Sequence, residues 1–118
     1  MIKRILRDAP KVYLSTQPVD MRKQINGLAA IVQNDFDLDL YDRALFVFSN
    51  RQHDKVKILE WDKDGFVLYY KRREKGRFSW PSKMPLCAAD EITQADLKRL
   101  LDGLLMERYI EKKNWKIT

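Results

Sequence analysis

Residues 44–72, ALFVFSNRQHDKVKILEWDKDGFVLYYKR, decide the fold of the chain, because three strand-forming runs follow one another with only short connections. The run ALFVF is continuously apolar, which is typical of a strand covered on both faces. In VKILEW the side chains alternate between two faces, and DKDG has the composition of a hairpin turn with a left-handed glycine. We therefore predict three consecutive antiparallel strands at about residues 44–49, 55–61 and 66–72.

The segments on either side of these strands predict one further strand and two helices. KVYLST, residues 11–16, is rich in β-branched and aromatic residues and reads as a first short strand. Apolar residues recur at helical spacing over about residues 20–34, with Asp20 as the predicted N-cap, and over about 94–106, with Thr93 as the predicted cap. The predicted fold class is α+β: a small antiparallel β-sheet (a three-strand meander plus a first short strand) with one helix before and one helix after.

The chain of 118 residues has the length of one ordinary domain. We expect a single domain over residues 1–118, with a core at about 10–106 and flexible ends; residues 107–118 either extend the last helix or form a basic tail. No apolar run approaches the roughly 18 residues that cross a bilayer, and the N-terminus lacks the apolar segment of a signal peptide. Cys87 is the sole cysteine, so an internal disulfide is excluded and a reducing cytoplasm is expected.

The charge of the chain is concentrated in one segment. Charged residues make up 34% of the sequence, above the usual quarter, and the net charge is +6. Residues 71–83 hold six cations and one anion, Glu74. Such a focused positive field favours a polyanionic partner such as nucleic acid, because each neutralised phosphate releases condensed counterions. An acidic membrane surface or an acidic protein is the alternative partner.

The segment YYKRREKGRFSWP, residues 69–81, adds aromatic rings to these cations. Cations that hold phosphates and rings that stack on bases together form nucleic-acid surfaces. Two further cations follow Asp20 at the start of the first predicted helix, where exposed amides favour an anion. The predicted nucleic-acid-binding residues are Arg22, Lys23, Tyr70, Lys71, Arg72, Arg73, Lys75, Arg77 and Trp80, with Tyr70 and Trp80 as the stacking rings.

A purely structural interpretation of the same segment stays open. Tyr69, Phe78 and Trp80 could pack into the core with Tyr70 half-buried, while the cations solvate the edge of a strand. In the same way, Asp20 could simply cap an ordinary exposed helix start.

Other residues with catalytic or metal-binding chemistry give weaker signals. Asp62 and Asp64, with Glu60 nearby, could bind Mg²⁺ for phosphoryl chemistry, but aspartate is common in tight turns. His53 beside Asp54 resembles a general base with its orienting acid, yet no nucleophile has a defined relation to it. Cys87 could be a reactive thiol, and a buried small apolar role suits it better. We therefore predict a protein that is not an enzyme, with no catalytic residue, metal or cofactor.

Three segments, VYLSTQPVDMRKQINGLAAIV, LFVFSNRQHDKVKILEWDKDGFVLYYKRREKGRFSWP and ITQADLKRLLDGL, resemble a known family by their order and spacing. Together, over roughly residues 10–105, they are similar to the TnpB-type accessory protein (Orf2-like) of family 66 bacterial insertion sequences. The resemblance implies a bacterial protein that is encoded beside a separate transposase and assists transposition of the element. It supplies no catalytic residues.

Two functions are consistent with the residues and the resemblance. The first is a non-catalytic DNA-binding accessory factor that helps the cognate transposase at the ends of the element, as a monomer or a homo-oligomer. The second is a protein-interaction subunit that docks on the transposase through the leucine-rich last helix and the basic face. A metal-dependent nuclease that uses Asp62 and Asp64 is a third, weaker hypothesis.

Overall fold

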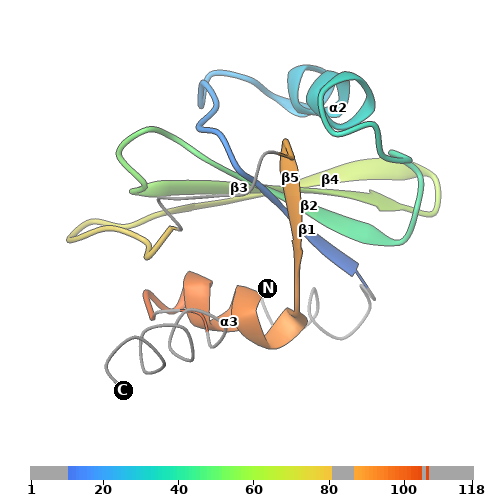
Figure 1. Cartoon of the computed structure of the whole chain (residues 1–118). Helices are drawn as coiled ribbons and strands as arrows, with labels where there is room; N and C mark the ends of the chain where they lie inside the picture. The colour runs from blue at the N-terminus through green and yellow to red at the C-terminus, as the bar shows by residue number, and fades with distance from the viewer. Residues whose placement is uncertain (1–10, 81–86, 105, 107–118) are drawn as a thin grey trace.

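The computed structural model describes residues 11–80, 87–104 and 106, which form one five-stranded sheet and two helices (Figure 1). The elements in chain order are β1 (Lys11–Ser15), α2 (Ile25–Asn34), β2 (Ala44–Ser49), β3 (Lys55–Asp62), β4 (Gly65–Arg72), β5 (Ala89–Ile92) and α3 (Gln94–Leu101). The predicted α+β class is confirmed. The three predicted strands at 44–49, 55–61 and 66–72 match β2, β3 and β4 to within one residue at each end.

The strands lie in the order β4-β3-β2-β1-β5, and the sheet is mixed rather than wholly antiparallel. β2, β3 and β4 form the predicted antiparallel meander, and β5 pairs antiparallel with β1. β1 and β2, however, are parallel. The prediction of a purely antiparallel sheet is wrong because α2 crosses between β1 and β2 and returns the chain so that both strands run in the same direction. The fifth strand, β5, is missing from the prediction.

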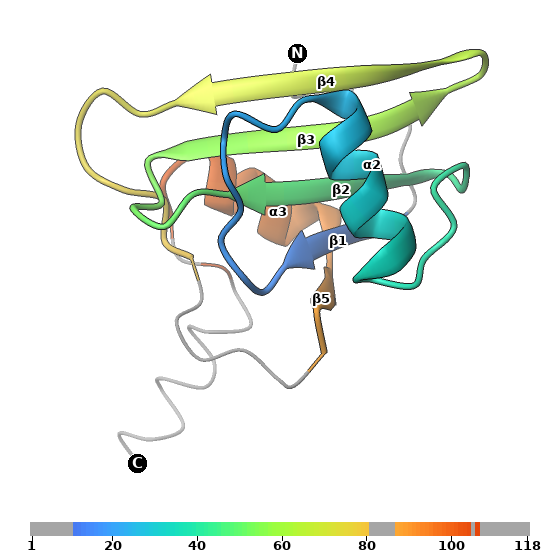
Figure 2. The same ribbon diagram turned by 90° about the horizontal axis from the view of Figure 1, so that it is seen from above.

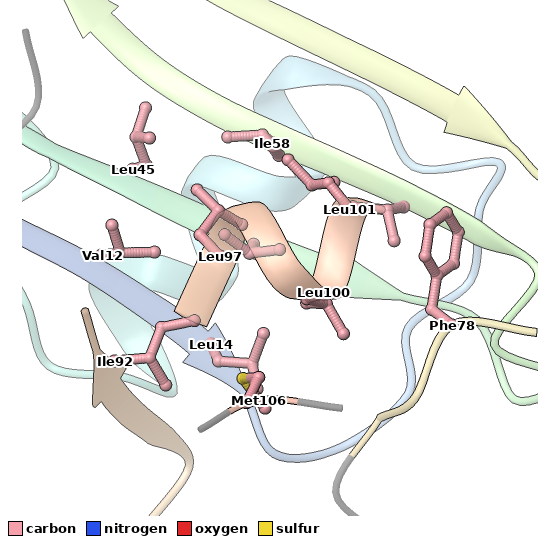
Figure 3. Close-up of a cluster of buried hydrophobic side chains, with 12 residues drawn as sticks. Val12, Leu14, Leu45, Ile58, Phe78, Ile92, Leu97, Leu100, Leu101 and Met106 are labelled. Atoms are coloured by element: carbon pink, nitrogen blue, oxygen red, sulfur yellow. The ribbon is translucent and has the colours of Figure 1, made fainter. Parts of the chain in front are cut away.

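The helices cover opposite faces of the sheet (Figures 1 and 2). On one face, Leu28, Ala29 and Val32 of α2 pack against strand residues that include Phe46 and Phe48. On the other face, the leucines of α3 pack against apolar side chains of β1, β2 and β3 and against Phe78 from the loop after β4 (Figure 3). The buried residues of this cluster are Val12, Leu14, Leu45, Val47, Val56, Ile58, Phe78, Ile92, Leu97, Leu100, Leu101 and Met106.

Helix α2 begins at Ile25, five residues later than predicted. Asp20 is not its N-cap: the cap position is Gln24, whose side chain makes no capping hydrogen bond. Asp20 instead closes a separate turn, in which its carboxylate accepts the Arg22 amide at 2.9 Å and its carbonyl accepts the Lys23 amide at 3.1 Å. A carboxylate that is engaged by this local turn cannot also cap the helix that follows.

Helix α3 begins as predicted and ends early. The Thr93 hydroxyl accepts the Asp96 amide at 3.0 Å, which confirms the predicted cap. The helix stops at Leu101 rather than near 106 because Gly103 adopts a left-handed φ of 79°. The amide of Leu104 then bonds to the carbonyl of Arg99 at 2.8 Å, which completes the helix end.

Two smaller predictions are corrected by the structure. The left-handed residue of the β3–β4 turn is Lys63, with φ 55°, and not Gly65, which is paired with Asp62. Cys87 is exposed, so the interpretation of this residue as a buried apolar side chain is wrong. The predicted flexible ends and the C-terminal tail at 107–118 lie outside the described residues. No helix in the described part of the chain combines the length and the apolar character that a membrane span requires.

Candidate nucleic-acid interface

The loop after β4 is held in a defined shape that displays two cations. The Arg73 amide donates to the Asp54 carbonyl at 2.8 Å, and the Arg73 Nε donates to the Lys75 carbonyl at 3.1 Å. Gly76 turns the chain with a φ of 76°, and the amide of Phe78 then bonds to the carbonyl of His53 at 2.7 Å. The loop projects beyond the sheet in Figure 1.

Lys75 and Arg77 at the tip of this loop are exposed, and neither contacts a carboxylate within the described residues. We call these two residues the loop patch.

Because side chains alternate along a strand, Lys71 lies on the opposite face of the sheet from Tyr70 and Arg72. The Lys71 Nζ donates to the carbonyl of Leu101 at 2.5 Å, at the C-terminal end of α3. A lysine there offsets the negative end of the helix dipole and satisfies a carbonyl that has no partner inside the helix. The structure therefore gives Lys71 an intramolecular role on the α3 face of the sheet.

Arg73 reaches the same helix end. A Cβ atom added to Gly103 would overlap the guanidinium of Arg73, so the arginine lies directly against this glycine. The guanidinium is also 5.8 Å from the centroid of the Phe78 ring, in cation–π contact. Arg73 is half-buried and, like Lys71, helps to fix the end of α3.

The remaining strand cations lie toward the α2 face. Arg72 is exposed and forms an ion pair with Glu74 at 2.9 Å. Tyr70 is 48% exposed, and the Nζ of Lys57 lies 5.7 Å from the centroid of its ring. Lys57 is itself buried and donates hydrogen bonds of 2.8 Å to the carbonyls of Met21 and Lys23. This lysine therefore fixes the segment before α2 next to Tyr70.

The predicted cations before α2 are both exposed. The Arg22 guanidinium donates to both carboxylate oxygens of Asp20, from Nε to Oδ1 at 3.1 Å and from Nη2 to Oδ2 at 2.6 Å. The hydrogen bond from Arg22 holds the pKa of the Asp20 carboxyl at about 2. Lys23 folds its aliphatic stem toward Gly27, and it makes no ion pair among the described residues. We call Arg22, Lys23 and Tyr70 the helix patch.

Trp80 is part of the packing rather than a free ring. Its Nε1 donates to the carbonyl of Ser15 at 3.2 Å, and its ring stacks on His53 with centroids 5.7 Å apart and planes 6° apart. His53 is partly buried, and this burial, followed by the nearby charge of Arg77, lowers the pKa of the imidazole. The structural interpretation of the aromatic residues thus applies to Phe78, which is buried, and in large part to Trp80.

The structure brings together only some of the predicted binding residues. Tyr70 lies with Arg22 and Lys23 on the α2 side, the loop patch projects after β4, and Lys71 and Arg73 are engaged at the end of α3. Lys57 was missed by the sequence reasoning. The signal was present, because strand alternation places this lysine on the same apolar face as Leu59.

The described ranges contain no cluster of three or more His, Cys, Asp or Glu side chains that could hold a metal ion. Asp62 and Asp64 flank the left-handed residue of the β3–β4 hairpin, where the turn interpretation placed them.

Comparison with known proteins places the chain in a family. Residues 10–111 match the family described as IS66 Orf2 like protein. The uncharacterized protein y4hO of Sinorhizobium fredii (strain NBRC 101917 / NGR234) is 37% identical over 94 residues, which cover 80% of each chain. The uncharacterized protein y4jC of the same strain is 37% identical over 71 residues, which cover 60% of this chain and 61% of y4jC. No solved structure matches the chain. The chain therefore belongs to the IS66 Orf2-like family, which associates it with an accessory role in the transposition of insertion sequences.

Proposed function

We propose that the chain is a non-catalytic DNA-binding accessory factor that assists the transposase of its element in the bacterial cytoplasm. The observation that carries the proposal is the loop patch: Lys75 and Arg77 are exposed and project from a turn that is anchored on both sides. Cations that are held apart from carboxylates contribute their whole field to a phosphate. Arg72, whose surface ion pair with Glu74 is easily exchanged, lies beside them.

The helix patch supplies the second contact. Lys57 fixes the segment that carries Arg22 and Lys23, and Tyr70 presents an exposed ring next to it. A ring and two cations on one side fit an unpaired or distorted strand, in which a base can stack while phosphates are held. Lys71, Arg73 and Trp80 support the surface from within and are not proposed as contacts.

Fluorescence anisotropy with labelled element-end DNA and scrambled DNA, over a salt series, tests the proposal. The slope of log K against log [salt] should be roughly −0.9 per duplex phosphate contacted. Lys75→Ala with Arg77→Ala should make the slope less negative by about two such units. The matched control is Lys63→Ala with Lys98→Ala, which removes the same charge from exposed positions elsewhere. Equal effects of the two double variants, or no salt-dependent binding, would contradict the proposal.

Docking on the transposase is a second candidate function, with a different surface from the one expected. Leu97, Leu100 and Leu101 are buried in the core, so the leucine-rich face of α3 is not available to a partner. An aromatic cluster in which Tyr41 is exposed and Trp61 and Phe66 are partly buried lies instead beside the β3–β4 hairpin. Tyr41, 56% exposed, packs edge-on against Trp61 at 5.0 Å, and Trp61 packs against Phe66 at 4.9 Å.

Beside this cluster, residues that include Arg43 and Glu60 line a hollow of about 650 Å³. Exposed aromatic anchors of this kind often mediate protein interfaces.

A pull-down with the cognate transposase separates the two functions. Tyr41→Ala should weaken capture if the aromatic cluster docks on the transposase, and it should leave DNA anisotropy unchanged. Tyr70→Ala removes a second exposed tyrosine of the described residues, near the opposite end of β4, and should weaken DNA binding without affecting capture. Capture that is unchanged by Tyr41→Ala would contradict docking through this cluster.

A further inference from the structure

β4 is an edge strand of the sheet that the described residues form. It pairs with β3 along all of Gly65–Arg72, and no described strand pairs with its other side (Figure 2). The Arg73 amide donates to the Asp54 carbonyl just before β3, so the backbone groups of odd-numbered residues in β4 face β3. The amides and carbonyls of the even-numbered residues Phe66, Leu68 and Tyr70 therefore face away from the sheet. Every second residue of this eight-residue edge strand therefore presents a backbone donor and acceptor.

The sequence of β4 contains little of the usual protection against pairing. The first six residues of β4, GFVLYY, contain no charge and no proline. The opposite edge strand, β5, has only four residues and carries Asp90 and Glu91. Short length and charge are the devices that keep sheet edges from pairing, and β5 has both. The contrast between the two edges marks β4 as the edge suited to a partner strand.

We propose that two copies of the chain pair antiparallel through β4, with the two-fold axis at Leu68. A two-fold axis perpendicular to the sheet keeps both α2 helices on one side, so residues of the same strand face must lie opposite each other. This register places Leu68 opposite Leu68, Phe66 opposite Tyr70, Val67 opposite Tyr69, and Arg72 opposite Asp64. Aromatic, β-branched and opposite-charge cross-strand pairs are all stabilising.

Neighbouring registers are less complementary. An axis at Val67 would place Lys71, which lies within β4, opposite Lys63, and an axis at Tyr69 would place Lys71 and Arg72 opposite the apolar Val67 and Phe66. The Leu68 axis pairs residues 66–70 of β4 only with one another, and it places like charges opposite each other only beyond the strand, at Arg73 with Lys63 and Glu74 with Asp62. Like charges directly opposite each other are destabilising. The Leu68 axis gives Arg72 a carboxylate partner in the second copy, and its present partner Glu74 is an exposed surface contact that is readily given up. The pairing concerns the free protein, and its tests are carried out without DNA.

Disulfide trapping tests the register in the full chain with Cys87→Ser, which removes the exposed native thiol. Leu68→Cys would face its own copy across a hydrogen-bonded pair, with Cα atoms about 5.5 Å apart, within disulfide range. Tyr70→Cys is the control: its two copies would lie roughly 14 Å apart along the strands. Mild oxidation at low protein concentration should cross-link only the Leu68→Cys protein. Cross-linking of Tyr70→Cys to an equal or greater extent would overturn the register.

Charge reversal tests the same pairing without touching the core, because Asp64 and Arg72 are both exposed. Arg72→Asp and Asp64→Arg should each raise the dimer dissociation constant about tenfold, since two pairs per dimer become repulsive. The double variant should restore dimerisation in sedimentation equilibrium or light scattering. The proposal would be overturned by a wild-type protein that is monomeric at all concentrations. It would also be overturned if the charge reversals left the dimer dissociation constant unchanged.

Discussion

The Nζ of Lys57 lies 5.7 Å from the centroid of the Tyr70 ring while it donates hydrogen bonds to two carbonyls of the segment before α2. One buried cation thus joins β3, β4 and the start of the helix. Its aliphatic stem is covered, so the charge faces both the π-system and the carbonyl oxygens.

Replacing Lys57 with methionine should destabilise the protein, because the carbonyls of Met21 and Lys23 lose their donor. Hydrogen bonds from a charged donor contribute about 1.5–3 kcal/mol, and their loss should appear as a lower urea midpoint with an unchanged slope. Lys55→Met, two residues earlier on the same strand face, is the control and should cost less, because its Nζ makes only a 3.5 Å contact with Asp54. Equal losses would mean that the two carbonyl bonds do not stabilise the fold.

Lys71 and Lys75 should separate stability from DNA binding. Lys71→Met removes the bond to the Leu101 carbonyl and should cost about 0.5–1.5 kcal/mol of unfolding free energy. Lys75→Met should leave stability unchanged and weaken DNA binding, because the side chain is exposed at the loop tip. Urea unfolding and DNA anisotropy should be measured on both variants. A stability loss in Lys75→Met together with weaker DNA binding only in Lys71→Met would contradict the roles assigned to the two lysines.

Gly103→Ala should destabilise the protein for two separable reasons. The left-handed φ of 79° is unfavourable for alanine by about 1–2 kcal/mol, and the added Cβ would displace Arg73. Gly76→Ala has a similar φ of 76° but only a 3.7 Å approach to Arg73, so it reports the φ cost alone. Thermal or urea unfolding should show the larger loss for Gly103→Ala, and adding Arg73→Ala should recover the difference between the two. Equal losses of stability for Gly103→Ala and Gly76→Ala would mean that the Arg73 guanidinium can move away from the added Cβ without measurable cost.

His53 is the one histidine of the chain, so its NMR titration is an unambiguous probe of the loop patch. Burial and the charge of Arg77 lower its pKa in the folded protein. A lowered histidine pKa means that the unfolded chain binds more protons below about pH 6.5, so this contribution to stability is present above that pH and is lost as the pH falls through the folded value.

DNA bound at Arg77 should raise the pKa of His53 towards its ordinary value, because a phosphate cancels the nearby positive charge. Arg77→Ala should raise the pKa in the absence of DNA and abolish the further response. A His53 titration curve that does not move on addition of saturating DNA would place the DNA away from Arg77.

The meander was predictable from the sequence because its strands are consecutive and their signals are local: a continuous apolar run, a second run whose side chains divide between two faces, and a turn-forming DKDG. The parallel pairing of β1 with β2 was not, since it depends on where α2 carries the chain. β5 was missed because ADEI contains two carboxylates and only one strongly β-forming residue.

The candidate site was harder to predict because composition does not tell which face a strand residue takes. Lys71 and Arg72 are adjacent in sequence, yet one binds the end of α3 and the other is exposed on the α2 side. The number of cations therefore predicted where the positive segment lies. It did not predict which of these cations make contacts within the fold and which are exposed to solvent.

The order of the strands has a consequence for how the molecule assembles and opens. β2, β3 and β4 are joined by short turns, whereas β1 pairs with β5 across most of the chain, as in Val12 with Ile92. Distant pairings incur loop-closure entropy before they contribute any contact, so β5 and α3 should dock last and detach first. Native-state hydrogen exchange should then show early exchange of the Ile92 and Leu97 amides, while those at the centre of β3 exchange only on complete unfolding.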